Sequence, residues 1–404
     1  KMNTNDPNYN VFDHMVQVCS GKWDVVASRY NLLADAAARY PRQTPCPISG
    51  EGKTKFRFQR GWEDSGLGYH NDRGALSILQ VVSEIEGINK GEAAKRLIAM
   101  CGGSNVDFNP KQVKAIRNRT FKLDEKEAKK RCNSIQKVLK ECTPASESDI
   151  VKMYFKTRTG LDYNVIPDSL LFHPELAYYE YDNQKKKPVF AGKHPALVCK
   201  FVDVDGQGIT LHRIFLQVNA DGSVSKLKQE SKVEKGVFID PKKVMSPPRD
   251  MSRGNIRLFD KDGITEAPMG GFVGSFTEGV ETGMAVLNAT GISTMACYSD
   301  TILANQDVDR MVEKNLKFVV IWGDKDAGFA GQDKAFKLAR KFRRKGVEAQ
   351  VVLPSLPITG KGVDWEDELK AFGPDHLLDM MTRSVTYDEA KAEHEKFVEA
   401  GGVS

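Results

Sequence analysis

Three acidic residues stand where two apolar segments end. Glu278 follows "GFVGSFT", and Asp324 and Asp326 follow "KFVVIWG" one residue apart. Carboxylates this close repel one another and raise each other's pKa unless a cation intervenes. Mg²⁺ prefers hard oxygen ligands and keeps several waters while it binds phosphates. These residue types therefore point to a divalent-metal site that handles phosphate groups.

A second interpretation of "DKDAG" is a solvent-exposed turn that caps the following helix. The position of Glu278 argues against a mere turn, because it lies at the end of a separate apolar segment upstream. In an open parallel sheet, ligands gather beyond the carboxyl ends of the strands. Gly279 and Gly328 would let a phosphate or a metal approach the backbone closely.

The elements that must position these acids follow from the pattern after residue 270. Short apolar segments alternate with segments of helical period, which predicts a parallel sheet with helices on both faces. We expect strands at 271–279, 293–299, 317–324 and 347–354, and helices at 280–291, 305–315 and 330–346. Thr386 and Glu389 form a capping box that opens a last, polar helix.

The upstream sequence has a different texture. The first hundred residues mix helices with a small hairpin formed by "KFRFQRGW" and "GLGYHNDRG". Residues 104–142 read as a basic, helical connector. Residues 160–262 read as short strands with turns at Asp205-Gly206 and "NADGS".

Positive charge is unevenly distributed, although the net charge is only +5. Residues 111–140 carry eleven Lys and Arg against three acids, residues 334–345 carry seven against none, and residues 241–261 carry six against two. Such segments suit a polyanion, because neutralising phosphates releases counterions. The alternative for each segment alone is a solvated helix face.

The remaining bulk features predict a cytoplasmic protein. No apolar run approaches the roughly 18 residues of a membrane span, and no signal peptide is visible at the N-terminus. The seven cysteines follow no regular spacing, which favours a reducing compartment. No G-x-x-x-x-G-K-[ST] motif occurs, so we expect no fused ATP-driven helicase.

The acidic motifs resemble a known family. "TEGVETG" and "GDKDAG" are similar to the motifs of the Toprim domain of primases, topoisomerases and some nucleases, and most similar to those of phage- and plasmid-type primases. "LHRIFL", "NADGS" and "KKVMSP" followed by "IRLF" resemble the segment that precedes Toprim in those primases. The resemblance covers about residues 150–370.

The resemblance implies roles for individual residues. Glu278 matches the family's acid/base or metal-ordering glutamate, Asp324 and Asp326 match the metal-binding pair, and Glu281 matches a second glutamate that shapes the site. Such enzymes use Mg²⁺ or Mn²⁺ for phosphoryl transfer. Basic residues near the site would hold the template and the triphosphate, for which we expect Arg213, Lys243, Arg253 and Arg257.

A last motif of the domain is altered. "KGVDWEDEL" resembles the family's K-D-x-N-D-x-L, which makes Asp364 a candidate metal ligand and Lys361 a candidate phosphate contact. Gly362 and Val363 precede Asp364, and Glu366 stands where asparagine is usual.

The N-terminal region resembles a zinc ribbon that has lost its ligands. "CPISGEGKTKFRF" and "GLGYHNDRGALSILQ" keep the shape of the primase ribbon, but Ser49 and Arg73 stand in ligand positions, and only Cys46 and His70 remain. Structural zinc needs four N or S ligands, so we expect no zinc.

The hairpin of this region could still contact a template. Alternation along "KFRFQRGW" places cations on one face and aromatic rings on the other, so Arg57, Arg60 and Trp62 are candidate template contacts. The alternative, which we favour slightly over base stacking, is that the rings form the core.

The sequence thus predicts an α/β protein in which a Toprim-type parallel sheet with flanking helices follows an α+β subdomain and a small zinc-ribbon-like domain. The expected segments are 1–103 (template binding), 104–145 (basic linker), 146–265 (N-terminal part of the polymerase domain), 266–372 (Toprim) and 373–404 (helical tail).

The resemblance implies a stand-alone DNA primase in the cytoplasm of a bacterial cell, encoded by a phage or mobile element. It would use single-stranded DNA and ribonucleoside triphosphates, with a separate replicative helicase and DNA polymerase as partners. A Toprim nuclease and a non-catalytic single-stranded-DNA-binding replication factor remain as alternatives.

Overall fold

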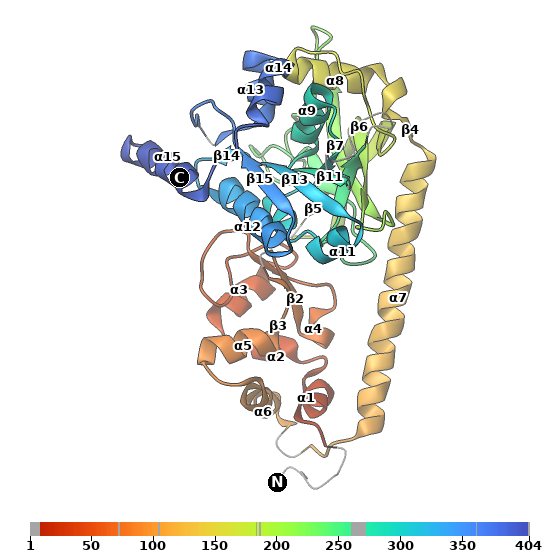
Figure 1. Ribbon diagram of the computed structural model, residues 1–404. Coiled ribbons are helices and arrows are strands. Elements are labelled where there is room, and N and C mark those ends of the chain that lie inside the picture. The colour runs from red at the N-terminus through yellow and green to blue at the C-terminus, as the bar shows by residue number, and fades with distance from the viewer. Residues whose placement is uncertain are drawn as a thin grey trace. The chain divides into compact units, whose positions relative to one another are not determined.

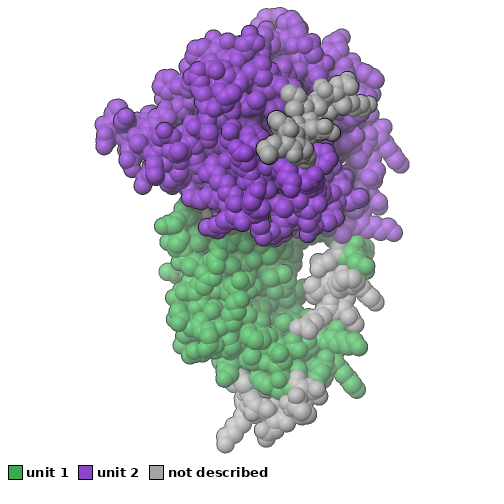
Figure 2. Space-filling view, viewed as in Figure 1, with its two compact units in different colours: residues 1–127, 181–187 green, residues 128–180, 188–404 purple. Residues whose placement is uncertain are grey.

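The structure is a computed structural model that describes residues 9–71, 73–103, 106–182, 184–185, 187–259, 272–360 and 362–402. The chain divides into two compact units (Figure 2). Unit 1 comprises residues 1–127 and 181–187, and unit 2 comprises residues 128–180 and 188–404.

Unit 1 packs short helices around a small antiparallel sheet. Its helices are α1 (Val11–Cys19), α2 (Trp23–Ala27), α3 (Asn31–Ala38), α4 (Trp62–Ser65), α5 (Ile78–Glu86) and α6 (Lys90–Met100), and its strands are β1 (Phe56–Phe58), β2 (Leu67–His70) and β3 (Gly74–Ser77). The strands pair in the order β1-β2-β3. Gly68 lies beneath a ring of the core, since a Cβ there would lie 2.3 Å from the Phe56 ring. This close approach explains why a glycine interrupts β2.

One long helix carries the basic connector. Helix α7 (Pro110–Lys140) begins after Asn109, whose side chain accepts hydrogen bonds from the Lys111 and Gln112 amides. Lys137 and Lys140 lie in its last turn, where cations are favourable for the helix dipole. The helical interpretation of this segment is confirmed.

Unit 2 is built on one mixed sheet (Figure 1). Its strands are β4 (Thr143–Pro144), β5 (Leu170–Asp182), β6 (Lys187–Val202), β7 (Gly208–Val218), β8 (Val224–Lys226), β9 (Lys242–Val244), β10 (Asn255–Leu258), β11 (Phe272–Thr277), β12 (Thr294–Ala296), β13 (Leu316–Trp322) and β15 (Glu348–Val352). They lie in the order β15-β13-β11-β12-β10-β6-β5-β4, and β7 joins β6 to β8 and β9. A separate pair consists of β14 (Lys325–Asp326) and β16 (Gly362–Val363).

The parallel part of this sheet confirms the predicted architecture. Strands β15, β13, β11 and β12 run parallel, and the helices of unit 2 are α8 (Asp149–Thr159), α9 (Val280–Thr290), α10 (Asp300–Ala304), α11 (Val308–Glu313), α12 (Ala330–Arg344), α13 (Trp365–Phe372), α14 (Pro374–Met380) and α15 (Tyr387–Glu399). The predicted helix at 305–315 is shorter and follows α10. The capping box of Thr386 and Glu389 opens α15 as expected.

Two apolar layers enclose the parallel strands. Val319 and Ile321 of β13 pack in one cluster with Phe342 of α12. The alternate residues Val320 and Trp322 pack in another with Trp365 of α13 and with α9 and α14. Strands covered on both faces carry near-continuous apolar runs, which is why "KFVVIW" shows no alternation.

Among the described residues, no helix combines the length and the apolar character needed to span a bilayer.

Candidate active site

Glu278 and Asp324 leave neighbouring parallel strands at the same level. In the register of β11 and β13, Thr277 lies beside Trp322. Glu278 directly follows Thr277, and Asp324 follows Trp322 after one intervening residue, Gly323. The two carboxylates therefore meet at the carboxyl edge of the sheet, where the sequence predicted them.

Asp324 carries a buried oxygen that has no partner. Its Oδ1 atom is inaccessible to solvent and forms no hydrogen bond within the described residues. Burial raises the pKa of Asp324 well above its usual range, and the charges of Glu278, Asp364 and Asp326 raise it further. A buried carboxylate oxygen that has no partner and lies near other carboxylates is a site where a bound cation would offset the negative charge.

Asp326 bonds the start of α12 and also lies among other acids. Its Oδ2 accepts a hydrogen bond of 2.7 Å from the Gly331 amide in the first turn of α12. A Cβ on Gly331 would lie 2.7 Å from the same oxygen, so only glycine permits this approach. Burial raises the pKa of Asp326 and Asp300 adds to this effect. The capping interpretation is thus right for one oxygen, and the carboxylate still faces other acids.

Asp364 joins the acids through the small β14–β16 pair. Gly362 lies opposite Asp326, and a Cβ on Gly362 would lie 2.6 Å from the Lys325 carbonyl oxygen. The glycine that departs from the family motif is therefore what lets the two segments approach. Asp364 then caps α13 by accepting from the Glu366 and Asp367 amides. Burial raises its pKa.

Asp300 is a member of this group that the sequence interpretation missed. It opens α10, just beyond the third parallel strand β12, and its charge raises the pKa of Glu278. The signal was available, because "STMACYSD" places an acid after a predicted strand in the same way as the other two segments.

These carboxylates suit a hard divalent cation that shares its coordination with phosphate. Within the described residues, no three His, Cys, Asp or Glu side chains form a ready-made metal cage. Mg²⁺ usually takes one or two carboxylates together with waters and substrate phosphates, so it does not need such a cage. Asp324 and Asp326 are the residues that would hold it, with Glu278 and Asp364 beside them.

A family comparison agrees with this geometry. Residues 275–375 match the family model of the Toprim domain. The chain contains a Toprim domain. Residues 129–253 match a second model, described as a domain of unknown function (DUF7146). Among curated proteins, none matches this sequence.

Solved structures similar to this chain include two primases. One is the Aquifex aeolicus primase (zinc-binding and RNA polymerase domains), with 14% identity, a TM-score of 0.33, and coverage of 93% of this chain and 89% of that one. Another is a DNA primase domain from Pseudomonas aeruginosa, with 12% identity, a TM-score of 0.32, and coverage of 51% and 56%. The domain assignment rests on the family match and on the site geometry.

Two lysines approach the Toprim carboxylates from the preceding strands. Lys226 of β8 and Lys242 of β9 each place Nζ 2.9 Å from Oε1 of Glu281, which is buried in the first turn of α9. Although burial alone would raise it, the two ammonium groups hold the pKa of Glu281 well below its usual range. The charge of Lys242 also lowers the pKa of Glu278, although burial and the neighbouring acids outweigh it.

Helix α8 completes this buried network. The Tyr154 hydroxyl lies 3.2 Å from Oε1 of Glu281. One turn further along α8, Arg158 forms a bidentate ion pair with Glu366, next to Asp364. Glu366 stands where the family motif has asparagine, and its partner in unit 2 supplies the compensating charge.

Arg213 and Lys243 lie on the other face of their strands. Arg213 of β7 pairs in register with Lys243, whereas Ile214 pairs with Lys242. Neighbouring residues of a strand point to opposite faces. Lys243 places Nζ 3.0 Å from the Tyr179 carbonyl oxygen and 4.2 Å from the centre of the Tyr178 ring, away from Glu281. The lysine that faces the carboxylates is thus Lys242, which the sequence interpretation passed over.

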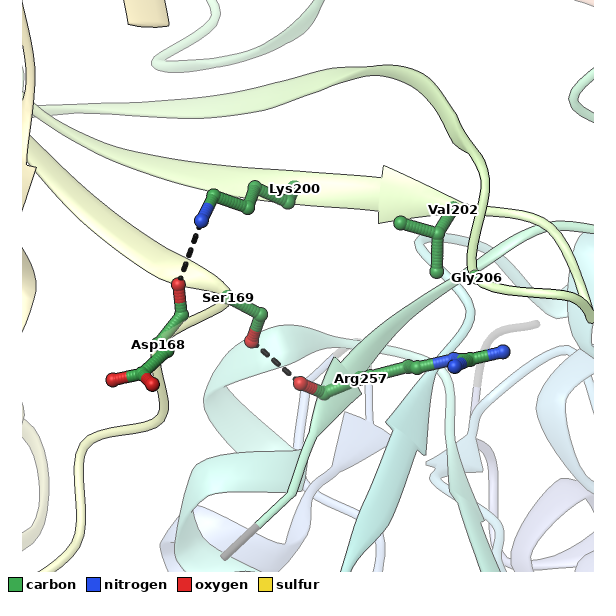
Figure 3. Close-up of a pocket in the computed structure, with 6 residues that line it drawn as sticks. All are labelled: Asp168, Ser169, Lys200, Val202, Gly206 and Arg257. Atoms are coloured by element: carbon green, nitrogen blue, oxygen red, sulfur yellow. Dashed lines mark hydrogen bonds between the residues drawn. The ribbon is translucent and has the colours of Figure 1, made fainter.

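The other predicted cations lie apart from the carboxylates or outside the described residues. Arg253 is exposed and pairs with Asp307 at 3.3 Å. Arg257 lines a pocket of about 240 Å³ with Asp168, Ser169, Lys200, Val202 and Gly206 (Figure 3). Its guanidinium donates to the Asp203 and Val204 carbonyl oxygens. Lys361 lies outside the described residues.

The former zinc positions of unit 1 now hold other contacts. Hydrogen bonds from Ser49 lower the pKa of the Cys46 thiol, although burial opposes them. Arg73 forms a bidentate ion pair with Glu84 of α5 at 2.9 and 2.6 Å. His70 is buried on β2. An ion pair to the following helix thus occupies one of the predicted ligand positions.

The proposed role of Trp62 as a template contact is wrong. Trp62 is buried in the core of unit 1, and its ring stacks on Phe58 with centroids 4.1 Å apart. Phe56 and Phe58 are also buried, while Arg57 between them is exposed. Arg60 is exposed and pairs with Glu127 at 3.0 Å. The rings thus belong to the core of unit 1, and of the three predicted template contacts Arg57 and Arg60 face solvent.

The pKa of Glu278 leads to a testable pH dependence of stability. Burial, with the charges of Asp300 and Asp326, raises it from 4.5 to about 7. Between these values the unfolded chain releases a proton that the folded protein keeps, so the stabilisation present below pH 4.5 is lost as the pH rises to about 7. Without divalent metal, we expect the free energy of unfolding to fall by up to about 1.4 kcal/mol per pH unit across this window.

Urea unfolding at several pH values would measure this slope. The Glu278→Gln variant removes one titrating group, so we expect its curve to fall less steeply between pH 5 and 7. Burial also raises the pKa of Asp324 and of Glu366, and these groups keep part of the slope. An identical slope in the variant would contradict the assignment.

Proposed function

We propose that this protein is a DNA primase, which joins ribonucleotides into short primers on single-stranded DNA. The observation that carries the proposal is the meeting of Glu278, Asp324 and Asp326 at one sheet edge of a Toprim domain, with a buried, unpartnered oxygen on Asp324. The strand-rich segment before Toprim and the ribbon-like N-terminal region, which resemble those of primases, favour this activity over a nuclease.

The acidic residues and the lysine of the site have different proposed roles. Asp324 and Asp326 would hold Mg²⁺ or Mn²⁺, which when bound would neutralise triphosphate charge and lower the pKa of the attacking hydroxyl. Glu278, with its pKa near 7, is suited to exchange a proton at neutral pH. Lys242, which is paired with Glu281 and whose charge acts on Glu278, would attract the negative charge of the incoming nucleotide.

A primer-synthesis assay tests the proposal. The full chain is incubated with mixed-sequence single-stranded DNA, the four ribonucleoside triphosphates and Mg²⁺ or Mn²⁺, and the products are resolved by length. Short RNA products support a primase. Cleaved template without RNA would show a nuclease instead, and template binding without either product would show a non-catalytic replication factor. A parallel reaction with a chelator controls for the metal.

The adjacent lysines offer a matched pair of variants. Lys242→Met removes an ammonium that faces Glu278 and Glu281, so we expect the rate of primer synthesis to fall by about 10- to 100-fold. Lys243→Met acts on the other face, and we expect a change below about threefold. Steady-state rates on one template compare the two variants, and equal losses would contradict the assigned facing.

A further inference from the structure

Three exposed aromatic rings of unit 2 lie on β5, on β6 and on the loop between β8 and β9. The exposed fractions are 53% for Tyr179 of β5, 48% for Phe190 of β6 and 58% for Phe238 of the loop between β8 and β9. The Tyr179 and Phe190 rings lie 5.7 Å apart, edge to face. Their chain neighbours Tyr178, Ala191 and Ile239 are buried in one apolar cluster. The rings are thus exposed on well-packed elements.

The loop that carries Phe238 is attached to the same strands. The Ser231 hydroxyl and the Lys232 amide bind the Glu180 carboxylate of β5. The Gln229 side chain donates to the Ala191 carbonyl oxygen of β6 at 3.0 Å. These contacts place the loop beside Tyr179 and Phe190.

Lysine side chains accompany these rings. Lys232 lies 5.9 Å from the centre of the Phe190 ring, and Lys228 lies 5.4 Å from the centre of the Phe238 ring. An ammonium near an aromatic face is attracted to its π electrons. The segment 226–243 carries six lysines against three acids. Rings accompanied by ammonium groups suit a partner that has both flat bases and phosphates.

We propose that Tyr179, Phe190 and Phe238, with Lys228 and Lys232, form a stacking surface for single-stranded DNA. Unpaired bases would stack on the rings while the two lysines contact the phosphates, a combination that binds single strands with little sequence preference. A duplex hides its base faces and would meet only the lysines. The choice of DNA rests on the proposed primase function, in which this strand is the template.

The test compares exposed aromatic residues with and without lysine neighbours. We expect Phe190→Ala combined with Phe238→Ala to weaken binding of a fluorescein-labelled oligothymidylate by about 10-fold or more. Phe372→Ala is the control, because Phe372 of α13 is 52% exposed and has no recorded lysine contact among the described residues. Lys228→Gln with Lys232→Gln should reduce the salt dependence of binding.

Separate outcomes distinguish this surface from the catalytic proposal. If the double phenylalanine variant loses DNA binding while the unmodified chain makes no primers, the surface stands and the primase proposal fails. Unchanged binding of single strands by that variant would overturn the surface. An equal loss of duplex DNA binding would overturn its assignment to single strands.

Discussion

The Asp324→Asn variant is expected to lose primer synthesis by on the order of 10³-fold or more. Its Oδ1 is buried and unpartnered, and burial together with four other acids raises its pKa, so this oxygen is suited to bind a cation. Stabilising transition-state charge through a metal contributes several kcal/mol, and each 1.4 kcal/mol is about tenfold in rate.

The same substitution should leave the metal-free protein no less stable. Asparagine keeps the shape and removes a charge that Glu278 and Asp364 repel, so we expect an equal or higher melting temperature without metal. The rise in melting temperature on adding Mg²⁺ should disappear, because a ligand stabilises only the state that binds it.

Scanning calorimetry with and without Mg²⁺, beside the primer assay, measures both effects. Asp309→Asn is the control, since Asp309 is an exposed acid whose pairing with Lys345 contributes little. Primer synthesis by Asp324→Asn at a rate close to that of the unmodified chain would remove the basis of the proposed site.

The Glu281→Gln variant is expected to destabilise unit 2 by about 2–4 kcal/mol. Glu281 is buried, and its removal as an anion leaves the ammonium groups of Lys226 and Lys242 without their partner. Breaking a buried ion pair from one side costs about 3–5 kcal/mol, and both lysines are partly exposed, which reduces the loss.

A second substitution tests this explanation. Adding Lys226→Met to Glu281→Gln removes one excess ammonium, and we expect part of the lost stability to return. Glu313→Gln is the surface control, since the Arg310–Glu313 pair is exposed and should change the free energy of unfolding by less than about 0.5 kcal/mol. Urea unfolding measures all three variants. If Lys226→Met adds a further loss to that of Glu281→Gln, charge imbalance is not the cause.

The stability that Glu281 contributes changes with pH in the opposite direction to the stability that Glu278 contributes. Because the lysines keep the pKa of Glu281 below its usual 4.5, the stability it contributes is present above that value and is lost as the pH falls through its folded pKa. Glu278 loses its contribution as the pH rises towards 7. Between pH 4.5 and about 7, the surroundings therefore favour the neutral form of Glu278 and the anionic form of Glu281, three residues apart in the same motif.

The sequence alone determined the frame of the site. Apolar strands alternating with helical segments predict a parallel sheet, and acids that directly follow such strands must reach its carboxyl edge, wherever the helices pack. Glu278 and Asp324 were found in this way, and the capping box of Thr386 and Glu389 fixed the start of α15 from local chemistry.

Only the tertiary structure decided which side chains face that edge. Alternation states that Lys242 and Lys243 point to opposite faces, but not which face meets α9, since that depends on the pairing of β9 with β7. Alternation likewise did not decide whether Trp62 and the neighbouring rings face solvent, and they pack in the core of unit 1. The position of Asp364 depended on the pairing of Gly362 with Asp326. The position of Glu366 depended on its ion pair with Arg158, which is distant in the sequence. Local sequence patterns determine how side chains are spaced along an element. Which neighbouring element a side chain contacts is set by the free energy of packing distant segments together.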